Sequence, residues 1–466
     1  MLSNLIMDFH AGIERQRAFF RTGATRPLAF RRAQLRNLGD AIEKHEQALF
    51  DALHGDLRKS PYQAYTTEIG IVLAELQHAR RHLPAWMKPR RRHAPLLSWP
   101  SRGWVRPEPR GVALILGPWN YPFQLLLSPL VGAIAAGNCA VLKPSEFAPR
   151  TANVIAELIG ETFPPEYMAV VQGDRETAET LLREKFDGIF FTGSTPVGRA
   201  VMAAAAKHLT PVTLELGGKC PCLVCADTPV DLAARRIAWG KFMNAGQTCV
   251  APDYVLADRR IRNPLVAAVV RAIGEFYGEN PRQSPDYGRI VNRRHFDRLA
   301  GYLASGHVAH GGQLDVEDLY LAPTILTQVS WDSPVMQEEI FGPVLPVLEF
   351  DDLSAALEQL RHHPTPLALY LFTRDRVTRD RVLAETRSGG VCVNDTVSHM
   401  IGTGLPFGGL GESGFGAYHG QASFDCFTHY RSVLGRSLAY DLKLRYPPPR
   451  TALRRLRKVF RFLVGG

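Results

Sequence analysis

A cysteine and a glutamate occupy positions in this sequence from which their side chains can do chemistry. Cys249 ends the run Asn244-Ala-Gly-Gln-Thr-Cys249, after a predicted helix and among small and polar residues. A cysteine thiolate is a strong nucleophile, but free cysteine is also among the most buried residue types, so a structural cysteine is the alternative. Glu215 lies at the end of an apolar stretch, a setting that raises the pKa of a carboxyl group. The alternative for Glu215 is an ion pair with Lys219.

An asparagine and a glycine-bearing turn lie where open α/β sheets bind ligands. Asn120, in Gly117-Pro-Trp-Asn-Tyr-Pro122, follows an apolar run and is expected at the carboxyl end of a strand. The alternative is a turn asparagine beside two prolines. The segment Gly193-Ser-Thr-Pro-Val-Gly198 separates a predicted strand from a predicted helix. Its glycines let the backbone approach a diphosphate, and Ser194 with the following proline begins a helix whose N-terminus favours anions.

Short apolar runs alternate with helical patterns in the middle of the chain and supply the elements that must position these side chains. The runs are Val112–Leu116, Cys139–Leu142, Met168–Val171, Gly188–Phe191 and Val212–Leu216, and the helical patterns are Gln124–Ala136, Thr151–Glu161, Glu176–Glu184 and Val197–Lys207. Continuous apolar strands separated by helices predict a parallel sheet covered on both faces. We therefore expect an α/β fold with a Rossmann-like, dinucleotide-binding sheet.

The flanking segments have patterns of their own. Helical spacing predicts packed helices from Ala33 to about Trp86, and prolines and basic residues from Lys88 onward predict an extended connection. A second α/β region follows Gly217. Glycine-rich loops at Pro406–Gly416 precede an alternating stretch, Phe424–Leu434, that predicts a strand.

The composition is that of a globular enzyme from a reducing compartment. The 466 residues are 45% hydrophobic and 21% charged, which suits two or three packed domains and excludes a disordered chain. The seven cysteines are odd in number and lie in apolar segments, unlike those of a secreted disulfide scaffold. No apolar run reaches the ~18 residues of a spanning helix, and the first 16 residues do not resemble a signal peptide. We therefore expect a soluble, cytoplasmic protein.

The net charge of +10 is concentrated near the C-terminus, which argues against a nucleic-acid partner. Six basic residues without a nearby acid lie in the last 17 positions: Arg450, Arg454, Arg455, Arg457, Lys458 and Arg461. At about 100° per residue they share one arc of a helix over residues 450–464, opposite Leu453, Leu456, Val459, Phe460, Leu463 and Val464. We predict an amphipathic helix that touches an anionic membrane or the substrate entrance. The alternative is that its apolar stripe packs against a second copy of the chain.

Other cysteines and histidines invite a metal-site interpretation that the spacing does not support. Cys220-Pro-Cys222-Leu-Val-Cys225 has no matching histidine or cysteine pair at zinc-site spacing. Its apolar character predicts a buried strand, and we expect no metal. His399 and His419 are not required, because a nearby helix terminus and a bound cofactor can favour the thiolate without a Cys–His pair.

Five stretches of the chain, taken in order and with their separations, resemble the aldehyde dehydrogenase superfamily. They are Gly117-Pro-Trp-Asn-Tyr-Pro122, Lys143-Pro-Ser-Glu146, Phe191-Thr-Gly-Ser-Thr-Pro-Val-Gly198, Leu214-Glu-Leu-Gly-Gly-Lys219 with Gly246-Gln-Thr-Cys249, and Glu338-Glu-Ile-Phe-Gly-Pro343. The residues of these motifs, together with Glu161-Thr-Phe-Pro-Pro165 and Ala417-Tyr-His-Gly420, are similar to those of the class 3 branch, which includes fatty aldehyde dehydrogenases. The resemblance implies oxidation of an aldehyde to a carboxylic acid with NAD(P)+.

The resemblance also assigns roles to the candidate residues. Cys249 corresponds to the nucleophile, and the Asn120 amide with the backbone N–H of Cys249 corresponds to the donors for the oxyanion. Glu215 matches the general base that helps water to open the thioester. Tyr65 and Tyr121 resemble residues of the class 3 substrate pocket, which suits medium- or long-chain aliphatic or aromatic aldehydes.

Cofactor residues follow from the same resemblance. The set comprises Lys143 and Glu146 at the adenine-side ribose, Gly193, Ser194 and Gly198 at the diphosphate, and Glu339, Phe341 and Trp119 toward the nicotinamide side. A glutamate near the ribose disfavours a 2′-phosphate, and Lys143 offsets this in part, so we expect NAD, with NADP also accepted. For Glu339 the alternative is a surface acid, and for Phe341 a core residue.

By the same resemblance the chain divides into six segments and forms a homodimer through a strand near Phe424–Leu434. Residues 1–88 are N-terminal helices of the cofactor domain, 89–106 a bridging segment, 107–216 the dinucleotide-binding domain, 217–403 the catalytic domain, 404–446 glycine-rich loops with a bridging and dimerisation strand, and 447–466 a basic amphipathic tail.

Two other functions remain possible on this fold. Transfer of the thioester to coenzyme A is disfavoured by an intact Glu215, and a non-catalytic binding role by the presence of both Glu215 and Cys249.

Overall fold

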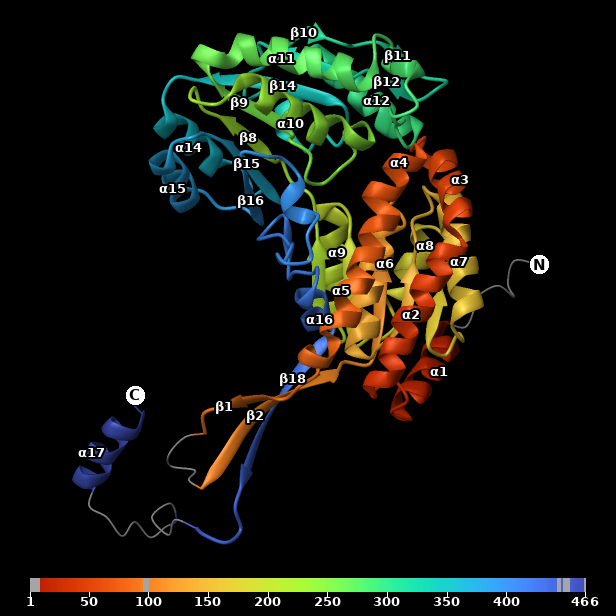
Figure 1. Cartoon of the computed structure of the whole chain (residues 1–466), viewed down its shortest axis with the longest axis vertical. Coiled ribbons are helices and arrows are strands. Elements are labelled where there is room, and N and C mark those ends of the chain that lie inside the picture. Colours follow the sequence, from red (N-terminus) through yellow and green to blue (C-terminus); the bar gives the residue numbers. More distant parts are fainter. Residues whose placement is uncertain (1–8, 95–99, 442–445, 447–452, 465–466) are drawn as a thin grey trace.

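The computed structural model describes residues 9–94, 100–441, 446 and 453–464, which form two α/β units and a projecting three-stranded arm (Figure 1). Each unit is built on a mostly parallel sheet with helices on its faces. The predicted α/β fold class is confirmed.

The first sheet has the strand order β17-β7-β6-β3-β4-β5. Its parallel strands agree with the five predicted apolar runs: β3 (Val112–Leu116), β4 (Cys139–Lys143), β5 (Met168–Val170), β6 (Gly188–Thr192) and β7 (Val212–Glu215). Every residue of β3, β4 and β6 is buried, which is why their sequences are continuously apolar. The short antiparallel strand β17 (Gly414–Phe415) comes from the glycine-rich segment and was not predicted from the sequence.

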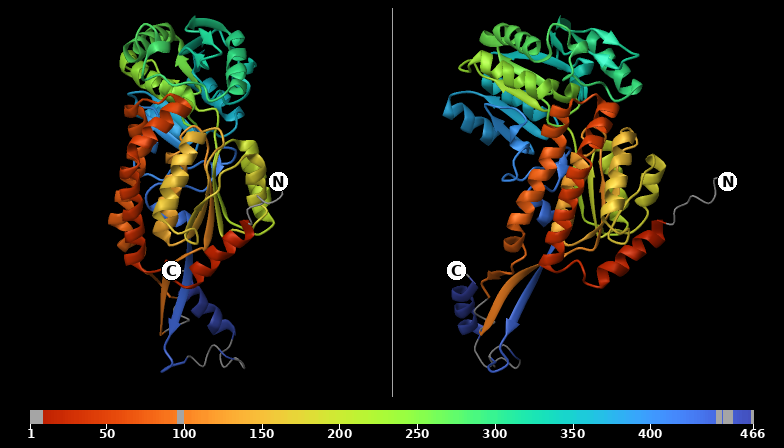
Figure 2. Two further views of the ribbon diagram at one scale, coloured as in Figure 1. Left: turned by 90° about the vertical axis from the view of Figure 1, so that its right-hand side faces the viewer. Right: turned by 45° about the vertical axis from the view of Figure 1, so that its right-hand side comes forward.

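Helices cover both faces of the first sheet (Figure 2). One layer contains α2 (Leu28–Lys44), α3 (Glu46–Leu57), α5 (Gly70–Trp86), α6 (Gln124–Ala136) and α7 (Pro149–Thr162). Helices α1 (Phe9–Arg21), α8 (Arg175–Leu181) and α9 (Thr195–Ala206) complete the unit. Between α3 and α5 lie α4 (Pro61–Ala64) and the π-helical turn η1 (Tyr65–Ile69). Helix α6 is buried along its whole length, so its N-terminal end is fixed against both the sheet and the helical layer.

The second sheet has the order β10-β13-β14-β9-β8-β15-β16, with β10 antiparallel to the rest. Its strands are β8 (Pro221–Val224), β9 (Tyr254–Asp258), β10 (His307–His310), β13 (Thr324–Thr327), β14 (Val344–Phe350), β15 (Ala368–Phe372) and β16 (Gly390–Val393), and β11 (Leu314–Asp315) pairs separately with β12 (Tyr320–Leu321). Its helical segments are α10 (Val230–Phe242), η3 (Met243–Gly246), α11 (Arg259–Tyr277), η4 (Pro281–Gln283), α12 (Arg293–Gly301), η5 (Tyr302–Ser305), α13 (Pro334–Gln337), α14 (Leu353–His362), α15 (Arg376–Glu385) and η6 (Ser398–Met400). The connection from β7 to β8 joins the two sheets and carries Glu215 at its start.

The arm is an antiparallel sheet of β1 (Arg90–Arg92), β2 (Ser101–Pro109) and β18 (Thr428–Arg436) that extends away from both units (Figures 1 and 2). The predicted strand Phe424–Leu434 is wrong in its first part, because α16 (Gln421–Cys426) is helical and β18 begins only at Thr428. Glu75 accepts hydrogen bonds from Gly420 N (2.6 Å) and Ser423 Oγ (3.1 Å) and thereby holds the start of this helix.

The C-terminal helix α17 (Leu453–Val464) lies beyond the arm (Figure 1). It agrees with the predicted helix over residues 450–464, of which the first three lie outside the described residues. In the described part of the chain, no helix is both long enough and apolar enough to cross a membrane.

Candidate active site

A turn in a rarely populated backbone conformation comes just before Cys249. Asn244, Ala245 and Gly246 have φ angles of 53°, 51° and 74°. The left-handed region costs a non-glycine residue roughly 1–2 kcal/mol. At Gly246 a side chain is excluded as well, because a Cβ atom would lie 2.2 Å from the carbonyl oxygen of Gly342. This turn reverses the chain after α10 and brings Cys249 back toward the first sheet.

Amide side chains hold the turn through hydrogen bonds. Gln247 Nε2 donates to the carbonyl oxygens of Asn244 (3.1 Å) and Arg289 (2.9 Å), while Gln247 Oε1 accepts from Val291 N (3.0 Å). Asn244 Nδ2 donates to the carbonyl oxygens of Asn120 (2.9 Å) and Gln247 (3.2 Å). These bonds offset the strain of the left-handed residues and determine where the Cys249 backbone lies.

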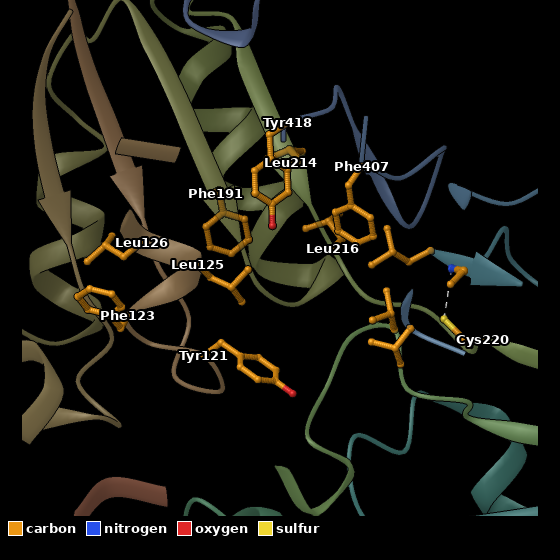
Figure 3. Close-up of a cluster of buried hydrophobic side chains, with 14 of the residues drawn as sticks. Tyr121, Phe123, Leu125, Leu126, Phe191, Leu214, Leu216, Cys220, Phe407 and Tyr418 are labelled. Carbon is orange, nitrogen blue, oxygen red and sulfur yellow. Dashed lines mark hydrogen bonds between the residues drawn. The ribbon is translucent and has the colours of Figure 1, made fainter. Parts of the chain in front are cut away.

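The loop after β3, residues 117–123, packs against this turn and is called the docked loop. Asn120 is only 3% exposed, and its Nδ2 donates to the carbonyl oxygen of Gln247 (3.0 Å). The next residue, Tyr121, shares a hydrogen bond of 2.6 Å with Thr248 Oγ1. Figure 3 shows the Tyr121 ring at the margin of a buried apolar cluster, with its hydroxyl directed away from Phe123. The structure thus brings the predicted oxyanion donor into the same hydrogen-bonded assembly as Cys249.

Glu215 is buried without an ionic partner. It is 1% exposed, and neither carboxyl oxygen has a hydrogen-bond partner within the described residues. The ion pair with Lys219, our alternative for Glu215, is not formed, because Lys219 Nζ binds Asp253 (2.5 Å) and the carbonyl oxygens of Val335 and Glu338. Burial raises the pKa of Glu215 to about 8, and the Cys249 thiol offsets part of this rise.

A second carboxyl group, that of the half-buried Glu339, lies close to the same thiol. A Cβ atom on Gly217 would come within 2.1 Å of its carboxyl oxygen, so this acid lies against the chain just after Glu215. Burial and the charge of Asp253 raise the pKa of Glu339 to about 8. Burial, Glu215 and Glu339 together hold the pKa of the Cys249 thiol well above its usual range. Our expectation that a helix terminus and a bound cofactor favour the thiolate concerns the coenzyme-bound protein and stays a prediction.

The adenine and diphosphate side of the predicted cofactor site lies at the carboxyl ends of the first sheet's strands. Lys143, at the end of β4, is buried and forms an ion pair of 2.9 Å with the partly exposed Glu146. Gly193 N donates to the carbonyl oxygen of Glu215 (3.1 Å). Ser194 precedes α9 in an extended conformation, and its side chain does not cap the helix. At Gly198 a Cβ atom would lie 2.6 Å from Leu216 Cδ2, so glycine allows α9 to approach β7 closely.

Aromatic side chains gather toward the nicotinamide side of the predicted site. Trp119 and Phe341 meet edge to face with ring centroids 5.3 Å apart, and Trp119 also lies 5.3 Å from the His295 ring. Phe341 has a φ of 50°, so its loop is also in a constrained conformation. The structure therefore brings Trp119, Phe341 and Glu339 together with the Cys249 turn, which packs against the adjacent Gly342.

An apolar cavity of about 370 Å³ lies beside the docked loop. Its walls come from α4, η1, α5, the start of α6, α10, α11 and the loop near η6, and are formed by Tyr62, Gln63, Thr66, Thr67, Ile71, Tyr121, Gln124, Trp239, Met243, Phe276, Tyr277, Asp286, Val397, Met400 and Ile401. Tyr121 and Tyr62 are among the residues that line this cavity, and Tyr65 is not. Tyr65 begins the π-helical turn η1, is partly exposed, and its ring lies about 3.3 Å from the Cβ position of Gly70.

The remaining cysteines and histidines have structural surroundings. Cys220 and Cys222 are buried at β8, as the buried-strand interpretation requires. Cys220 Sγ donates to the carbonyl oxygen of Cys249 (3.4 Å) and accepts from Ala368 N (3.3 Å), the contact drawn in Figure 3. Burial lowers the pKa values of His399 and His419 to about 4.

Two residues behind the docked loop were missed in the sequence. Lys59 and Glu68 form a fully buried ion pair of 2.5 Å. Single charged residues in a helical pattern are normally solvent-exposed, so neither stood out. Lys59 lies in the loop between α3 and α4 and Glu68 in η1, so no pattern in the sequence set them apart.

Comparisons with known proteins agree with this geometry. The model of the aldehyde dehydrogenase family matches residues 7–433. The chain is 45% identical to 4,4′-diaponeurosporen-aldehyde dehydrogenase of Staphylococcus aureus over 96% of this chain and 97% of that protein, and 48% identical to mouse aldehyde dehydrogenase family 3 member A2 over 93% and 90%. It is also 48% identical to the dimeric NADP-preferring aldehyde dehydrogenase of the dog over 94% and 97%.

Solved structures give the same result. The substrate-bound state of S. aureus AldH has a TM-score of 0.95 at 44% identity and covers 97% of this chain and 99% of that one. An indole-3-acetaldehyde dehydrogenase of P. syringae, in complex with NAD+ and IAA, has a TM-score of 0.83 at 27% identity over 91% and 88% of the two chains.

We predict that Glu339→Gln increases the alkylation rate of Cys249 by iodoacetamide in coenzyme-free protein. At pH 9, above the pKa of about 8, the Glu339 carboxylate is charged, and its removal lowers the thiol pKa. A lower thiol pKa leaves more thiolate at this pH, and we expect a roughly 3- to 10-fold faster reaction. Peptide mass spectrometry distinguishes Cys249 from the other cysteines. Glu338→Gln is the matched control, because Glu338 is largely exposed; an equal acceleration in both variants would contradict the prediction.

Proposed function

The chain belongs to the aldehyde dehydrogenase family and oxidises aldehydes with NAD(P)+, and we propose that Cys249 is the nucleophile of this reaction. One observation carries the proposal: a thiol, an unpaired buried carboxyl group and a buried side-chain amide converge on one hydrogen-bonded turn. A structural cysteine does not require such neighbours.

In the first half of the reaction, the Cys249 thiolate adds to the carbonyl carbon and forms a tetrahedral thiohemiacetal. The developing negative charge on oxygen is stabilised by the Asn120 amide and the backbone N–H of Cys249. Because Asn120 Nδ2 already donates one hydrogen bond to Gln247, its orientation is fixed and its second N–H is available. The carbonyl re-forms as hydride leaves the carbon; NAD(P)+, which Lys143 and the N-terminus of α9 would hold, would supply the hydride acceptor. Cys249 then carries a thioester.

In the second half, Glu215 assists hydrolysis of the thioester. Its carboxylate removes a proton from the attacking water, the carbon–sulfur bond breaks, and the carboxylic acid leaves. A pKa of about 8 makes this carboxylate a stronger base than an exposed glutamate. Because the base is present, we propose transfer to water rather than to coenzyme A.

The residues present fit a dinucleotide. The uncapped N-terminus of α9 is suited to a diphosphate, and the buried Lys143 is suited to ribose hydroxyls. Glu146 opposes a 2′-phosphate, but its ion pair with Lys143 reduces that effect. We propose NAD as the preferred coenzyme, with NADP also used.

The cavity supports an apolar substrate. Its aromatic and aliphatic walls, with Tyr121 beside the Cys249 turn, suit a medium- or long-chain aliphatic or an aromatic aldehyde.

A lipid-derived aldehyde also agrees with peripheral membrane contact of α17. Leu453, Phe460 and the described basic residues of this helix are exposed. When the helix lies on an anionic surface, its apolar residues are buried and its arginines contact phosphates.

We place the enzyme in the cytoplasm, because all seven cysteines are free, as is usual in a reducing compartment.

A homodimer is the assembly we propose. Strand β18 is nine residues long and, among the residues that the structure describes, pairs on one side only, with β2, so its other edge is open there. Long open edges are normally covered, and a two-fold axis lets one chain cover that of another. One relative is named a dimeric enzyme.

We predict that Glu215→Gln forms NADH in a single burst and then stalls at the thioester, whereas Cys249→Ser gives no burst. The steady-state rate of Glu215→Gln falls by about 10²- to 10⁴-fold. The wild-type deacylation rate rises with pH and levels off above about 8, because the base acts as the ionised carboxylate. Rapid mixing with pre-bound NAD measures both phases. Normal turnover in Glu215→Gln, or a missing burst despite normal coenzyme binding, would remove Glu215 from deacylation.

We predict that the protein has the mass of two chains in light scattering at micromolar concentration. Leu434→Glu, which puts a charge on the half-exposed leucine of β18, shifts the mass toward one chain. Leu314→Glu alters an equally exposed leucine of β11, outside the arm, and leaves the dimer intact. A monomeric or tetrameric wild type would reject the proposal.

We predict that ending the chain before Pro447 preserves turnover of short aldehydes and abolishes binding to anionic vesicles. Binding by the intact enzyme weakens at high salt, because exposed charges are screened. The relative kcat/KM for long-chain aldehydes decreases in the truncated enzyme. A full-length chain with Arg454, Arg455 and Arg457 changed to glutamate separates charge from length and also loses vesicle binding. Unchanged vesicle binding and an unchanged chain-length profile after truncation would show that the tail has neither role.

A further inference from the structure

The buried ion pair between Lys59 and Glu68 lies directly behind the Asn120 loop. Both side chains are fully buried, and Lys59 Nζ lies 2.5 Å from Glu68 Oε1. The same ammonium group donates to the carbonyl oxygen of Asn120 (2.9 Å) and lies 4.0 Å from the centre of the Tyr121 ring. Burial lowers the pKa of Lys59, and Glu68 opposes this effect. One cation therefore contacts two residues of the docked loop.

Glu68 holds the other end of this loop. Its second oxygen, Oε2, accepts hydrogen bonds from Phe123 N (2.9 Å) and Gln124 N (3.1 Å), the first backbone N–H groups of α6. A carboxylate at a helix N-terminus satisfies free donors and the helix dipole together. The residues from Asn120 to Gln124 are thus fixed at both ends by the same ion pair.

A local irregularity of the backbone places Glu68 there. Glu68 lies in the π-helical turn η1, between α4 and α5. A π-helical turn inserts an extra residue and rotates the following side chains, and such turns are frequent at functional sites. From this turn the Glu68 carboxylate reaches the α6 terminus.

We infer that Lys59 and Glu68 are positioning residues for the oxidation step, which act by holding the Asn120 amide where the oxyanion forms. This inference rests on the proposed role of Asn120. The carbonyl oxygen of Asn120 accepts from both Lys59 and Asn244, so its backbone is held from the first unit and from the Cys249 turn. A buried pair is a weak source of stability, but its directional bonds determine the geometry of a loop.

A comparable buried cation at the opposite end of α6 provides the control. Arg31 is 4% exposed, and its guanidinium donates to the carbonyl oxygens of Thr25 (2.9 Å) and Ala135 (3.1 Å). Arg31→Met therefore removes a buried cation that lies on α2 and contacts the end of α6 far from Asn120. A merely structural effect is expected to be the same for Arg31→Met and Lys59→Met.

The experiment measures the rate constant of the NADH burst in Lys59→Met, Asn120→Ala, the double variant and Arg31→Met, each saturated with NAD. Asn120→Ala is expected to slow the burst by roughly 100-fold, as loss of an oxyanion donor does. Lys59→Met slows it by about 10-fold or more, because small displacements of a catalytic group are costly. The double variant is no slower than Asn120→Ala alone, since Lys59 acts through Asn120. Arg31→Met lowers the melting temperature but keeps the wild-type burst, and all variants retain NAD affinity.

The outcomes separate the two levels of the proposal. A normal burst in Asn120→Ala rejects the proposed oxyanion role itself. A slow burst in Asn120→Ala with a normal burst in Lys59→Met, or with multiplicative effects in the double variant, overturns only the positioning role. Equal slowing by Arg31→Met overturns it as well. If Lys59→Met does not fold, Glu68→Gln decides, because it keeps an acceptor for the α6 N–H groups: a slower burst supports the inference and an unchanged one overturns it.

Discussion

The structure of the site depends on the amide hydrogen bonds that join Asn120 to the turn before Cys249. That turn places two non-glycine residues, Asn244 and Ala245, in the left-handed region, which is unfavourable in isolation. The side chains of Asn244 and Gln247 make it stable. Gln247 bonds within the second unit, and Asn244 Nδ2 donates to the carbonyl oxygen of Asn120 in the loop of the other α/β unit. The nucleophile is therefore positioned only when the two sheets are assembled. Glu215, at the end of β7, reaches the same place because the chain crosses there from one sheet to the other.

Two carboxyl groups beside one thiol have a chemical consequence. Glu215 and Glu339 both have pKa values raised to about 8, and both oppose ionisation of Cys249. In the free protein they favour the thiol over the thiolate. A positive charge brought next to it reverses this balance, because an opposite charge favours the thiolate. Burial also keeps the pKa of Glu215 high, so its carboxylate is basic enough to activate water. The same buried surroundings therefore suit both halves of the proposed reaction.

The sequence predicted those parts of the molecule that short-range pattern determines. Strands buried on both faces, such as Val112–Leu116, are continuously apolar and were located within a residue or two. Three predictions failed or were missed for long-range reasons. The helix that replaces the start of the strand at Phe424 is held by Glu75, which lies about 350 residues earlier. Tyr65 lies in a π-helical turn, which has no composition signal, and is not among the residues that line the cavity. Lys59 was overlooked because its partners, Glu68 and the Asn120 carbonyl, meet it only in the folded chain.

The docked loop also explains how one thiol serves two separate compartments. Tyr121 and Met243 belong to the wall of the apolar cavity, whereas Trp119, Glu339 and Phe341 lie toward the predicted nicotinamide side. Trp119, Asn120 and Tyr121 are consecutive, so the loop contributes to both sides while its amide faces the Cys249 turn between them. Hydride must pass from a carbon bonded to sulfur directly to the coenzyme, which requires the two binding regions to meet at the nucleophile. A loop fixed at both ends by buried hydrogen bonds holds the two binding regions in the same place beside the nucleophile. The residues of the cavity wall only exclude water and match the shape of an apolar substrate, so they can vary without moving that place.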